Sequence, residues 1–436
     1  MPRSTNGVRL AVAALIALGF GLTLLAFYPG VMTFDAKYVY LDIAKGFYGD
    51  WQSPVMTWLW KWIDPVAPGS ASMFLLIAVS YWLAFGLLAF ALARRSGALA
   101  VLLPILALLP PAFVFVGTIW RDVLFGVTWL LAAAVAYVAA ERAARLRLSL
   151  QAVALVLCAF GVLLRPNALI AVALLTGYIV WPARFSWRRT AILAVPAMVA
   201  FFALVQVVYY GALNATRQHA IQSVMVFDLG GISHFAKENQ FPVTFDAPET
   251  AMLLNGCYQP TEWDIFWRLE PCHFVMDRLE KEQKLFGTPA VPAAWLRAVS
   301  HHPLAYLEHR ASFMWNFLAG ANLTMWTADI EKPDATVFPD RALFGAVKAV
   351  HDWLKPTPLF RAGAWLIVCL VVCAVGWRRR ETPGGAFAIG VAGSAALYVL
   401  TFFAAGVASD FRYAYWAVLA GIAGSVVAAL PRPPPT

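Results

Sequence analysis

Long apolar stretches separated by polar connections are the main pattern of this chain. Ten stretches are candidates for crossing a membrane, at residues 8–28, 71–92, 98–116, 123–140, 149–164, 168–182, 190–211, 360–377, 385–406 and 413–430. About 20 apolar residues in a helix span the roughly 30 Å hydrocarbon core of a bilayer. The fifth and sixth stretches are shorter, and we expect them to be tilted, kinked at Pro166 or partly re-entrant. The pattern predicts an all-α polytopic membrane protein with about ten transmembrane helices.

The charged residues divide between two sets of connections. Four short connections carry clusters of arginine, at residues 94–95, 142–147, 184–189 and 378–380. Only Glu141 and Glu381, of 24 acidic residues, lie in these connections. Because Lys and Arg in short loops mark the cytoplasmic side, we expect these connections and both termini inside, and the acidic segments outside. The first stretch has Arg9 at its start and no Ala-x-Ala site, which predicts an uncleaved anchor.

Two long outer segments divide the chain into three parts. Residues 1–210 form an N-terminal membrane module that includes a first outer loop at 29–70, which is expected to be helical. Residues 211–359 are enough for a larger outer (periplasmic) domain and contain all seven histidines. Within it, the apolar piece 311–320 is too short to span and should lie on the membrane or pack in the domain. Residues 360–436 supply the last transmembrane helices and a short cytoplasmic tail.

Composition excludes a water-soluble protein. Hydrophobic residues make up 61% of the chain and charged residues 13%, against roughly 25% charged in soluble proteins. The net charge of +9 comes from arginines that set orientation and meet anionic membrane lipids. No basic stretch is interleaved with aromatic residues on a soluble domain, so no nucleic-acid partner is expected. The predicted location is the plasma membrane, which is the inner membrane in a bacterium.

The five cysteines separate by position. Cys158, Cys369 and Cys373 fall in apolar stretches and are expected to pack in the core. Cys257 and Cys272 lie in the larger outer segment, where an oxidising compartment favours a disulfide between them. Two free thiols are the alternative.

A helix is predicted just after the first span. Thr33 is a candidate N-cap, and Phe34, Tyr38 and Leu41 recur at helical spacing. Asp35 would then lie at the bilayer edge, where partial exclusion of water is expected to raise its pKa toward that of a general base. The alternative is that Asp35 caps or solvates the start of the helix. Asp42 shares its face about two turns further along.

A second element begins at Asp50-Trp51-Gln52-Ser53-Pro54 and continues into a tryptophan-rich stretch up to Trp62. Tryptophans at this density are typical of an interfacial belt. They could also line a lipid or sugar site, although belt packing is commoner.

This first loop resembles the GT-C superfamily of integral-membrane glycosyltransferases, and is most similar to bacterial multi-span members that use dolichyl- or polyprenyl-phosphate sugars. The likeness rests on Phe34-Asp35 near the start of the loop and Asp50-Trp51-x-x-Pro54 before an amphipathic stretch. Many members have His-Pro-Pro where this chain has Gln52-Ser53-Pro54. The resemblance implies a lipid-phosphate sugar as donor substrate and Asp35 as catalytic base. Asp50 and Gln52 are candidates for substrate binding.

A second turn of the chain carries a similar motif. Trp120-Arg121-Asp122-Val123-Leu124-Phe125 is similar to the Trp-Lys-Asp-x-Leu-Phe turn of some of these transferases. A guanidinium group can fork to phosphate oxygens while an adjacent carboxylate orients it. We therefore expect Arg121 to bind the donor phosphate and Asp122 to be a second catalytic carboxylate. Interfacial snorkelling with a local ion pair is the alternative.

Two further breaks carry arginine. Arg165-Pro166-Asn167 interrupts an apolar stretch, so Arg165 and Asn167 either line a cavity or mark a snorkelling end. Arg412-Tyr413 resembles a pair near the end of many family members, in a place suited to the donor phosphate. An interfacial anchor is the alternative there.

Metal and nucleotide chemistry find little support. His301, His302 and His309 lack the His-Glu-x-x-His spacing, so no metal ligands are assigned; a divalent metal is conceivable but unsupported. The segment from Trp295 to Tyr306 instead resembles a helix-turn that packs the outer domain on the spans. The chain has no Asp-x-Asp, Walker or dinucleotide-binding motif.

Two classes of function fit these features. The first is a hexosyl- or pentosyltransferase that moves sugar from a polyprenyl-phosphate donor to a glycan, lipid or protein acceptor, with its active site facing the periplasm or exterior. The second is a lipid-linked glycan transporter, which should show paired broken spans in symmetric halves. An O-antigen ligase or polymerase is a rival within the enzyme class, and would depend on Arg and His residues of the larger outer segment.

Overall fold

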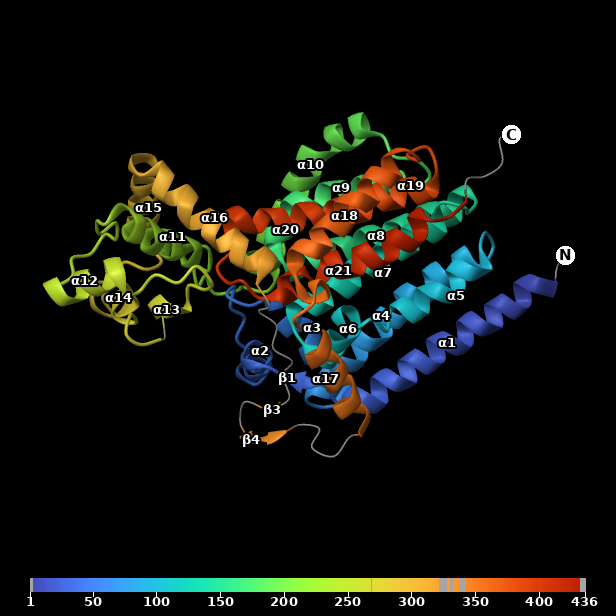
Figure 1. Ribbon diagram of the computed structural model, residues 1–436, viewed down its shortest axis with the longest axis horizontal. Helices are drawn as coiled ribbons and strands as arrows, with labels where there is room; N and C mark the ends of the chain where they lie inside the picture. Colours follow the sequence, from blue (N-terminus) through green and yellow to red (C-terminus); the bar gives the residue numbers. More distant parts are fainter. Residues whose placement is uncertain (1–2, 268, 321–327, 330–331, 337–341, 432–436) are drawn as a thin grey trace.

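A bundle of apolar helices carries a smaller helical lobe at one end (Figure 1). The computed structural model describes residues 3–267, 269–320, 328–329, 332–336 and 342–431. Almost all of the ordered structure in this part of the chain is helical, and the chain is an all-α polytopic membrane protein. Most of the expected C-terminal tail lies outside the described residues.

The bundle is built from helices of the N-terminal and C-terminal parts of the chain. Its elements are α1 (Arg3–Phe27), α4 (Ser70–Leu92), α5 (Gly97–Leu106), α6 (Pro110–Phe113), η2 (Val114–Gly117), α7 (Arg121–Ala139), α8 (Ala144–Leu164), η3 (Pro166–Ala168), α9 (Leu169–Val180), α10 (Trp187–Gln206), η4 (Val207–Ala212), α18 (Ala362–Trp377), α19 (Pro383–Phe387), η7 (Ala388–Ala392), α20 (Gly393–Ala405), η8 (Phe411–Ala414) and α21 (Tyr415–Ala428).

The number of membrane-length helices is smaller than the sequence predicts. Among the described residues seven helices are long and apolar enough to cross a membrane, and an eighth results if the pair Gly97–Leu106 and Pro110–Gly117, bent by 61°, is one span. Pro166–Val180 and Ala362–Trp377 are apolar but shorter. Each of the ten expected stretches is therefore helical, but length alone does not establish ten spans.

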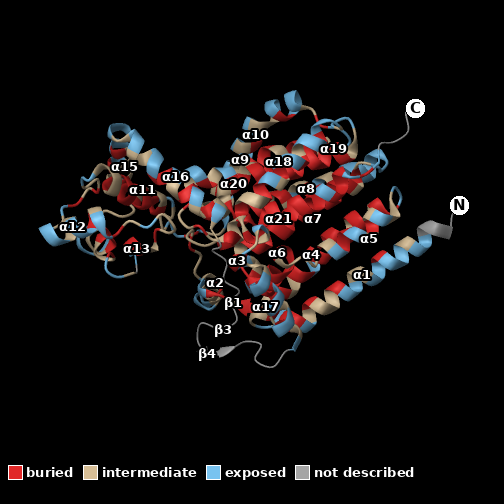
Figure 2. Cartoon of the chain, in the orientation of Figure 1, coloured by how far each residue is buried: buried red, intermediate tan, exposed pale blue. Residues whose placement is uncertain are grey.

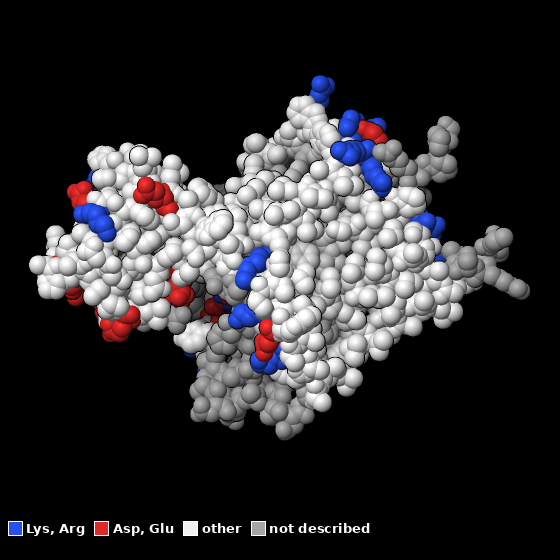
Figure 3. Space-filling model, viewed as in Figure 1, with Lys and Arg blue, Asp and Glu red and all other residues white. Residues whose placement is uncertain are grey.

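The arginine-rich connections meet at one end of the bundle. Arg95 pairs with Glu141 at 2.6 Å, the Phe185 amide donates to the Arg380 carbonyl at 2.6 Å, and Arg379 donates to the carbonyl of Ala428 at 2.8 Å. We call this the arginine end. The lobe lies at the opposite end, and Figure 3 shows most of the visible acidic residues there, with a largely uncharged surface between.

Burial within the bundle is uneven, as expected for helices in lipid. α7 and α21 are almost wholly buried at its centre (Figure 2). Close packing depends on glycine at Gly161, where a Cβ would lie 2.2 Å from the indole nitrogen of Trp129. By contrast, α10 exposes Ile192, Val195 and Phe202 along one side. An apolar face of this extent is typical of contact with lipid.

The lobe is a separate group of shorter helices held to the bundle by α16 (Figure 1). Its elements are α11 (Ile221–Ala236), α12 (Ala247–Asn255), α13 (Asp264–Trp267), α14 (Phe274–Met276), η5 (Asp277–Glu282), α15 (Ala290–His301) and α16 (Pro303–Ala319). The apolar piece 311–320 is the second half of α16, with Phe313 and Phe317 buried. It packs against α18 and α20.

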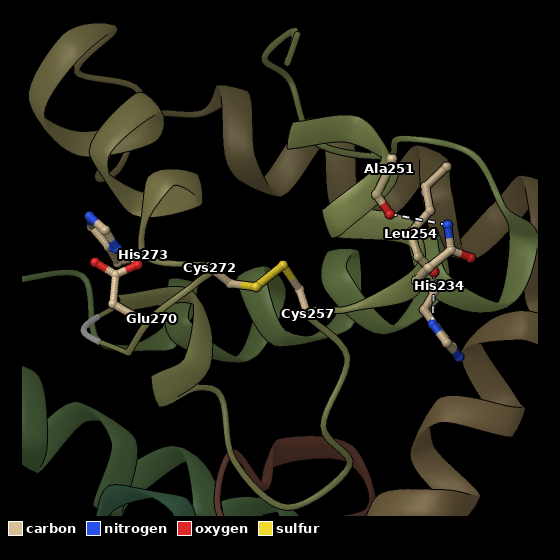
Figure 4. The surroundings of a disulfide bond; sticks show 8 residues. His234, Ala251, Leu254, Cys257, Glu270, Cys272 and His273 are labelled. Atoms are coloured by element: carbon tan, nitrogen blue, oxygen red, sulfur yellow. Dashed lines mark hydrogen bonds and ion pairs between the residues drawn. A yellow bond between two sulfur atoms is a disulfide. The ribbon is translucent and has the colours of Figure 1, made fainter. Parts of the chain in front are cut away.

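A disulfide joins two segments of the lobe. Cys257 follows α12, Cys272 precedes α14, and their sulfurs are bonded with the Cα atoms 5.6 Å apart (Figure 4). This is the pairing that the sequence predicts. The nearby His234 ring of α11 is 2.9 Å from the Leu254 carbonyl of α12. The disulfide therefore ties the loop after α12 to the segment before α14, and the His234 contact ties α12 to α11.

The remaining elements lie at the bundle end that faces the lobe. They are β1 (Val31–Met32), α2 (Phe34–Lys45), α3 (Pro54–Ile63), η1 (Asp64–Val66), β2 (Thr118–Ile119), β3 (Ala328–Asp329), β4 (Lys332–Thr336), α17 (Ala342–Leu354) and η6 (Pro358–Phe360). The first loop is helical, as expected. β1 pairs with β2 in parallel, and β3 with β4 in antiparallel orientation.

Candidate active site

The β1–β2 pairing brings the starts of α2 and α7 together. Val31 lies opposite Thr118 and Met32 opposite Ile119. The Trp120 indole donates to the Thr33 hydroxyl at 2.8 Å. Thr33 does occupy the N-cap of α2, but its side chain makes no capping hydrogen bond. Its oxygen instead accepts from Trp120, and in this way it ties α2 to the turn that carries Arg121.

Asp35 meets an arginine from the far end of the sequence. An Nη1 donor of Arg412 lies 2.9 Å from Asp35 Oδ2, and the Gln52 amide donates to Asp35 Oδ1 at 3.2 Å. The Asp35 side chain keeps 39% of its surface exposed, against 17% for Arg412. The carboxylate is therefore paired and still reachable from outside the protein.

Arg412 is held on several sides. Its guanidinium carbon lies 4.9 Å from the Trp120 ring centroid and 5.2 Å from that of Tyr413. Asp410 accepts from the Arg412 amide at 3.0 Å and places its second oxygen 3.2 Å from Arg412 Nε. Asp410 thus caps η8 and pairs with the arginine that follows it. Such fixation orients the guanidinium toward Asp35.

A second ion pair lies close by, between α7 and the break before α9. Arg165 contacts the carboxylate of Asp122, and its side chain stacks over Tyr413 at 5.0 Å. Asp122 is only 5% exposed. A carboxylate so enclosed is better placed to orient Arg165 than to take a proton from a substrate. Asn167 lies beside Tyr398 of α20.

Arg121 completes the cationic group. Its guanidinium donates to the Trp51 carbonyl at 3.0 Å, so it links the first loop to α7. Arg121, Arg165 and Arg412 are all close enough to act on Asp35 electrostatically. The structure therefore gathers these arginines and Asp35 from separate parts of the chain at one end of the bundle.

The pKa of Asp35 differs from the sequence-based expectation. Burial raises it, but Arg412, Arg121 and Arg165 outweigh burial, and the pKa lies below its ordinary value of 3.8. The expected raised pKa is therefore wrong for the protein alone. At Asp410 the balance is reversed, because burial raises the pKa by more than Arg412 lowers it. The pKa values of Asp35 and Asp410, which both pair with Arg412, are thus shifted in opposite directions.

Asp50 is engaged within the protein. Its carboxylate accepts from the Tyr210 hydroxyl at 2.8 Å and from the Gln218 amide at 2.6 Å. The Gln218 side chain in turn accepts from the Trp51 amide at 3.0 Å. These contacts anchor the loop that carries Gln52 to the segment after α10. Asp50 therefore positions its neighbours in this structure, and its expected contact with substrate stays a prediction.

The lobe holds the segment that leads to Arg412. The Gly406 carbonyl accepts from Arg310 at 2.7 Å. Next along the chain, the Trp263 amide donates to the Val407 carbonyl at 2.9 Å and the Ser409 amide to the Thr261 carbonyl at 2.7 Å. We call residues 406–410 the clamped segment. Its conformation fixes where Asp410 and Arg412 lie.

Sequence reasoning missed several members of this group. The sequence names Trp120 within a motif and Thr33 as a candidate N-cap, but it gives neither of them a role in the site, and it gives none to Asp410. Each of the three is adjacent to a candidate residue in the chain or close to one. That adjacency was the available signal. Arg310 carried none, because its role depends on a contact nearly 100 residues away in sequence, at Gly406.

No protein-family profile matches the chain, and no curated protein sequence matches it. Two solved structures are similar. The crystal structure of ArnT from Cupriavidus metallidurans in the apo state has 14% identity and a TM-score of 0.33, over 95% of this chain and 77% of that one. The crystal structure of ArnT from the same organism bound to undecaprenyl phosphate has 15% identity and a TM-score of 0.33, over 97% and 78%. Values this low carry no argument about the site.

Proposed function

We propose that this chain is a GT-C type glycosyltransferase that moves a hexosyl or pentosyl group from a polyprenyl-phosphate donor to a glycan, lipid or protein acceptor. The observation that supports it best is the pairing of the reachable Asp35 carboxylate with Arg412, beside Arg121 and Arg165. Such a group offers a proton acceptor and phosphate-binding cations within one site. The resemblance of the first loop to this superfamily points the same way.

In the proposed reaction, Asp35 accepts the proton of the acceptor hydroxyl. The oxygen of that hydroxyl bonds to the anomeric carbon of the donor sugar. The bond from that carbon to the phosphate oxygen breaks, and the polyprenyl phosphate leaves with the electron pair. Attack from the face opposite the phosphate inverts the anomeric configuration. Arg412, Arg121 and Arg165 stabilise the charge that grows on the leaving phosphate.

Donor binding should raise the low pKa of Asp35. The arginines that lower this pKa are the groups that we expect to hold the donor phosphate. A bound phosphate adds negative charge beside Asp35 and competes with it for Arg412. Both effects raise the proton affinity of the carboxylate. Asp35 would thus become an effective base when the donor is in place.

The proposal includes an orientation and a span count. We infer that all ten apolar segments cross the membrane, with the arginine end in the cytoplasm and the site outside. α9 and α18 support this count, because each starts near the site, after Arg165 and Arg361, and ends near an arginine-rich connection. Nucleotide sugars do not reach the outer face, so a lipid-phosphate donor is the sensible one there.

A gene-replacement experiment tests the function. Cells lacking the wild-type gene would carry Asp35→Asn, and lipid extracts would be examined by mass spectrometry for the polyprenyl-phosphate sugar that accumulates. The exchange keeps the shape of the side chain and removes the base, so we expect transfer to fall by roughly 10²-fold or more. The donor should accumulate as it does in the deletion strain.

Asp42→Asn is the matched control, since Asp42 lies on the same helix and outside the arginine group. It should leave transfer and donor levels as in the wild type. Full activity of Asp35→Asn would remove the assignment of the base. Loss of substrate movement without any change in sugar transfer would favour the transporter. Among the described residues, one bent helix pair is the only feature of the kind expected for a transporter.

A further inference from the structure

A cavity at the arginine end is separate from the candidate active site. Its volume is about 390 Å³, and it lies where the start of α1 meets the ends of α4 and α7. The volume falls in the range of roughly 300–1,000 Å³ that is usual for small-molecule sites. Val8, next to Arg9, packs against Gly97 at the start of α5, which fixes the position of α1 here.

The cavity has a cationic rim and apolar walls. Arg9, Arg94 and Arg142 line it together with one carboxylate, Glu141. The lining therefore carries a net charge of +2. Leu87 and Phe90 of α4 lie on the apolar side, with Val138 of α7. A site of this kind suits a ligand with a negative head and a hydrocarbon body.

The carboxylate does not neutralise all three cations. Glu141 forms an ion pair with Arg95 at 2.6 Å and lies 4.0 Å from Arg94. Among the described residues Arg9 and Arg142 have no carboxylate within 4.0 Å. Two guanidinium groups that line the cavity are thus available to an anion, and each can bind a phosphate group through two parallel hydrogen bonds.

We propose that this cavity binds one anionic glycerophospholipid, with its phosphodiester at Arg9 and Arg142 and the first part of an acyl chain along Leu87, Phe90 and Val138. Charge complementarity selects this occupant over a zwitterionic lipid, whose choline group would face the same arginines. The bound lipid would add contacts between α1, α4 and α7 beside the packing of Val8 on Gly97. This inference does not depend on the proposed transferase activity.

Native mass spectrometry of the purified full-length protein tests the site, with phosphatidylglycerol and phosphatidylcholine as probes. We expect one tightly held phosphatidylglycerol per chain and no comparable phosphatidylcholine. The double variant Arg9→Gln/Arg142→Gln should weaken phosphatidylglycerol binding by roughly 30-fold, about fivefold for each basic residue. Arg188→Gln, another exposed arginine at the same end, should not change it.

A second variant leaves all the charges in place. Leu87→Trp fills the apolar part of the cavity and should remove the one tightly held lipid without altering the cationic rim. Equal losses in Arg188→Gln and the double variant would overturn the proposal, because general surface charge would then explain binding. Equal retention of phosphatidylcholine would also overturn it. Tighter binding of undecaprenyl phosphate than of phosphatidylglycerol would assign the cavity to the carrier lipid instead.

Discussion

Burial raises the pKa of Asp35, whereas Arg412, Arg121 and Arg165 lower it, and the arginines prevail. The sequence places Asp35 correctly at the start of a helix just after the first span. It does not show that three arginines from later parts of the chain surround it. The direction of the shift therefore depends on tertiary contacts, which is why reasoning from the loop alone gave the wrong sign.

Removing Arg412 should reverse that shift. Because the folded pKa is lowered, Asp35 stays ionised as pH falls past its ordinary 3.8. Arg412→Gln removes the residue that lowers the pKa of Asp35 most, so the effect of burial, which raises this pKa, becomes larger in proportion. The acid limb of the kcat/KM profile should move to higher pH, along with a loss of donor binding. Arg297→Gln, at an exposed arginine of the lobe, should leave the limb unchanged; an unmoved limb in Arg412→Gln would argue against Asp35 as the base.

Among the elements, the clamped segment shows how the lobe acts on the site. Asp228 on α11 and Arg310 on α16 are fully buried and pair at 2.6 Å. The second oxygen of Asp228 accepts from the Trp295 indole at 2.7 Å. Arg310 then reaches the Gly406 carbonyl. This chain of contacts runs from the centre of the lobe to the segment that carries Arg412.

Breaking this buried pair should unfold or loosen the lobe. Arg310→Leu leaves the Asp228 charge without its main partner, and such a loss costs roughly 3–5 kcal/mol. Thermal unfolding of the purified protein should show a large drop in stability. Adding Asp228→Asn should recover part of the loss, because the unpaired charge is removed. Arg278→Leu, which breaks pairs that remain partly exposed to solvent, should cost much less stability. An equal drop there would contradict this account.

The helices themselves follow closely from the apolar pattern, whereas their partners do not. α2 starts at Phe34, as helical periodicity indicates. The apolar piece from residue 311 is helical but packs against α18 and α20 of the bundle, whereas the sequence predicts a place on the membrane or within the outer domain. Residues such as Thr33 and Asp50 carry polar groups whose use depends on distant segments. Thr33 bonds to Trp120, and Asp50 to Tyr210 and Gln218. A local pattern identifies such residues as important without revealing what they contact.

For the whole molecule, the two ends differ in chemistry as well as in charge. The arginine end gathers four basic connections, while the lobe end carries the disulfide and most acidic residues. α1 begins and α21 ends at the arginine end (Figure 1). An even number of crossings is therefore required if the bundle spans the membrane. Seven long helices alone cannot meet that condition, so at least one bent or short segment must cross as well.

This arrangement predicts a definite topology. Because positive charge in short loops is retained in the cytoplasm, reporter fusions after residues 95 and 187 should report the inside and those after residues 60 and 280 the outside. The disulfide between Cys257 and Cys272 agrees with an oxidising outer compartment. Accessibility of a single introduced cysteine at Ser300, on the exposed surface of the lobe, offers an independent check in intact cells. A cytoplasmic signal at residue 280 would place Asp35 on the nucleotide-rich side and remove the physical reason for a lipid-phosphate donor.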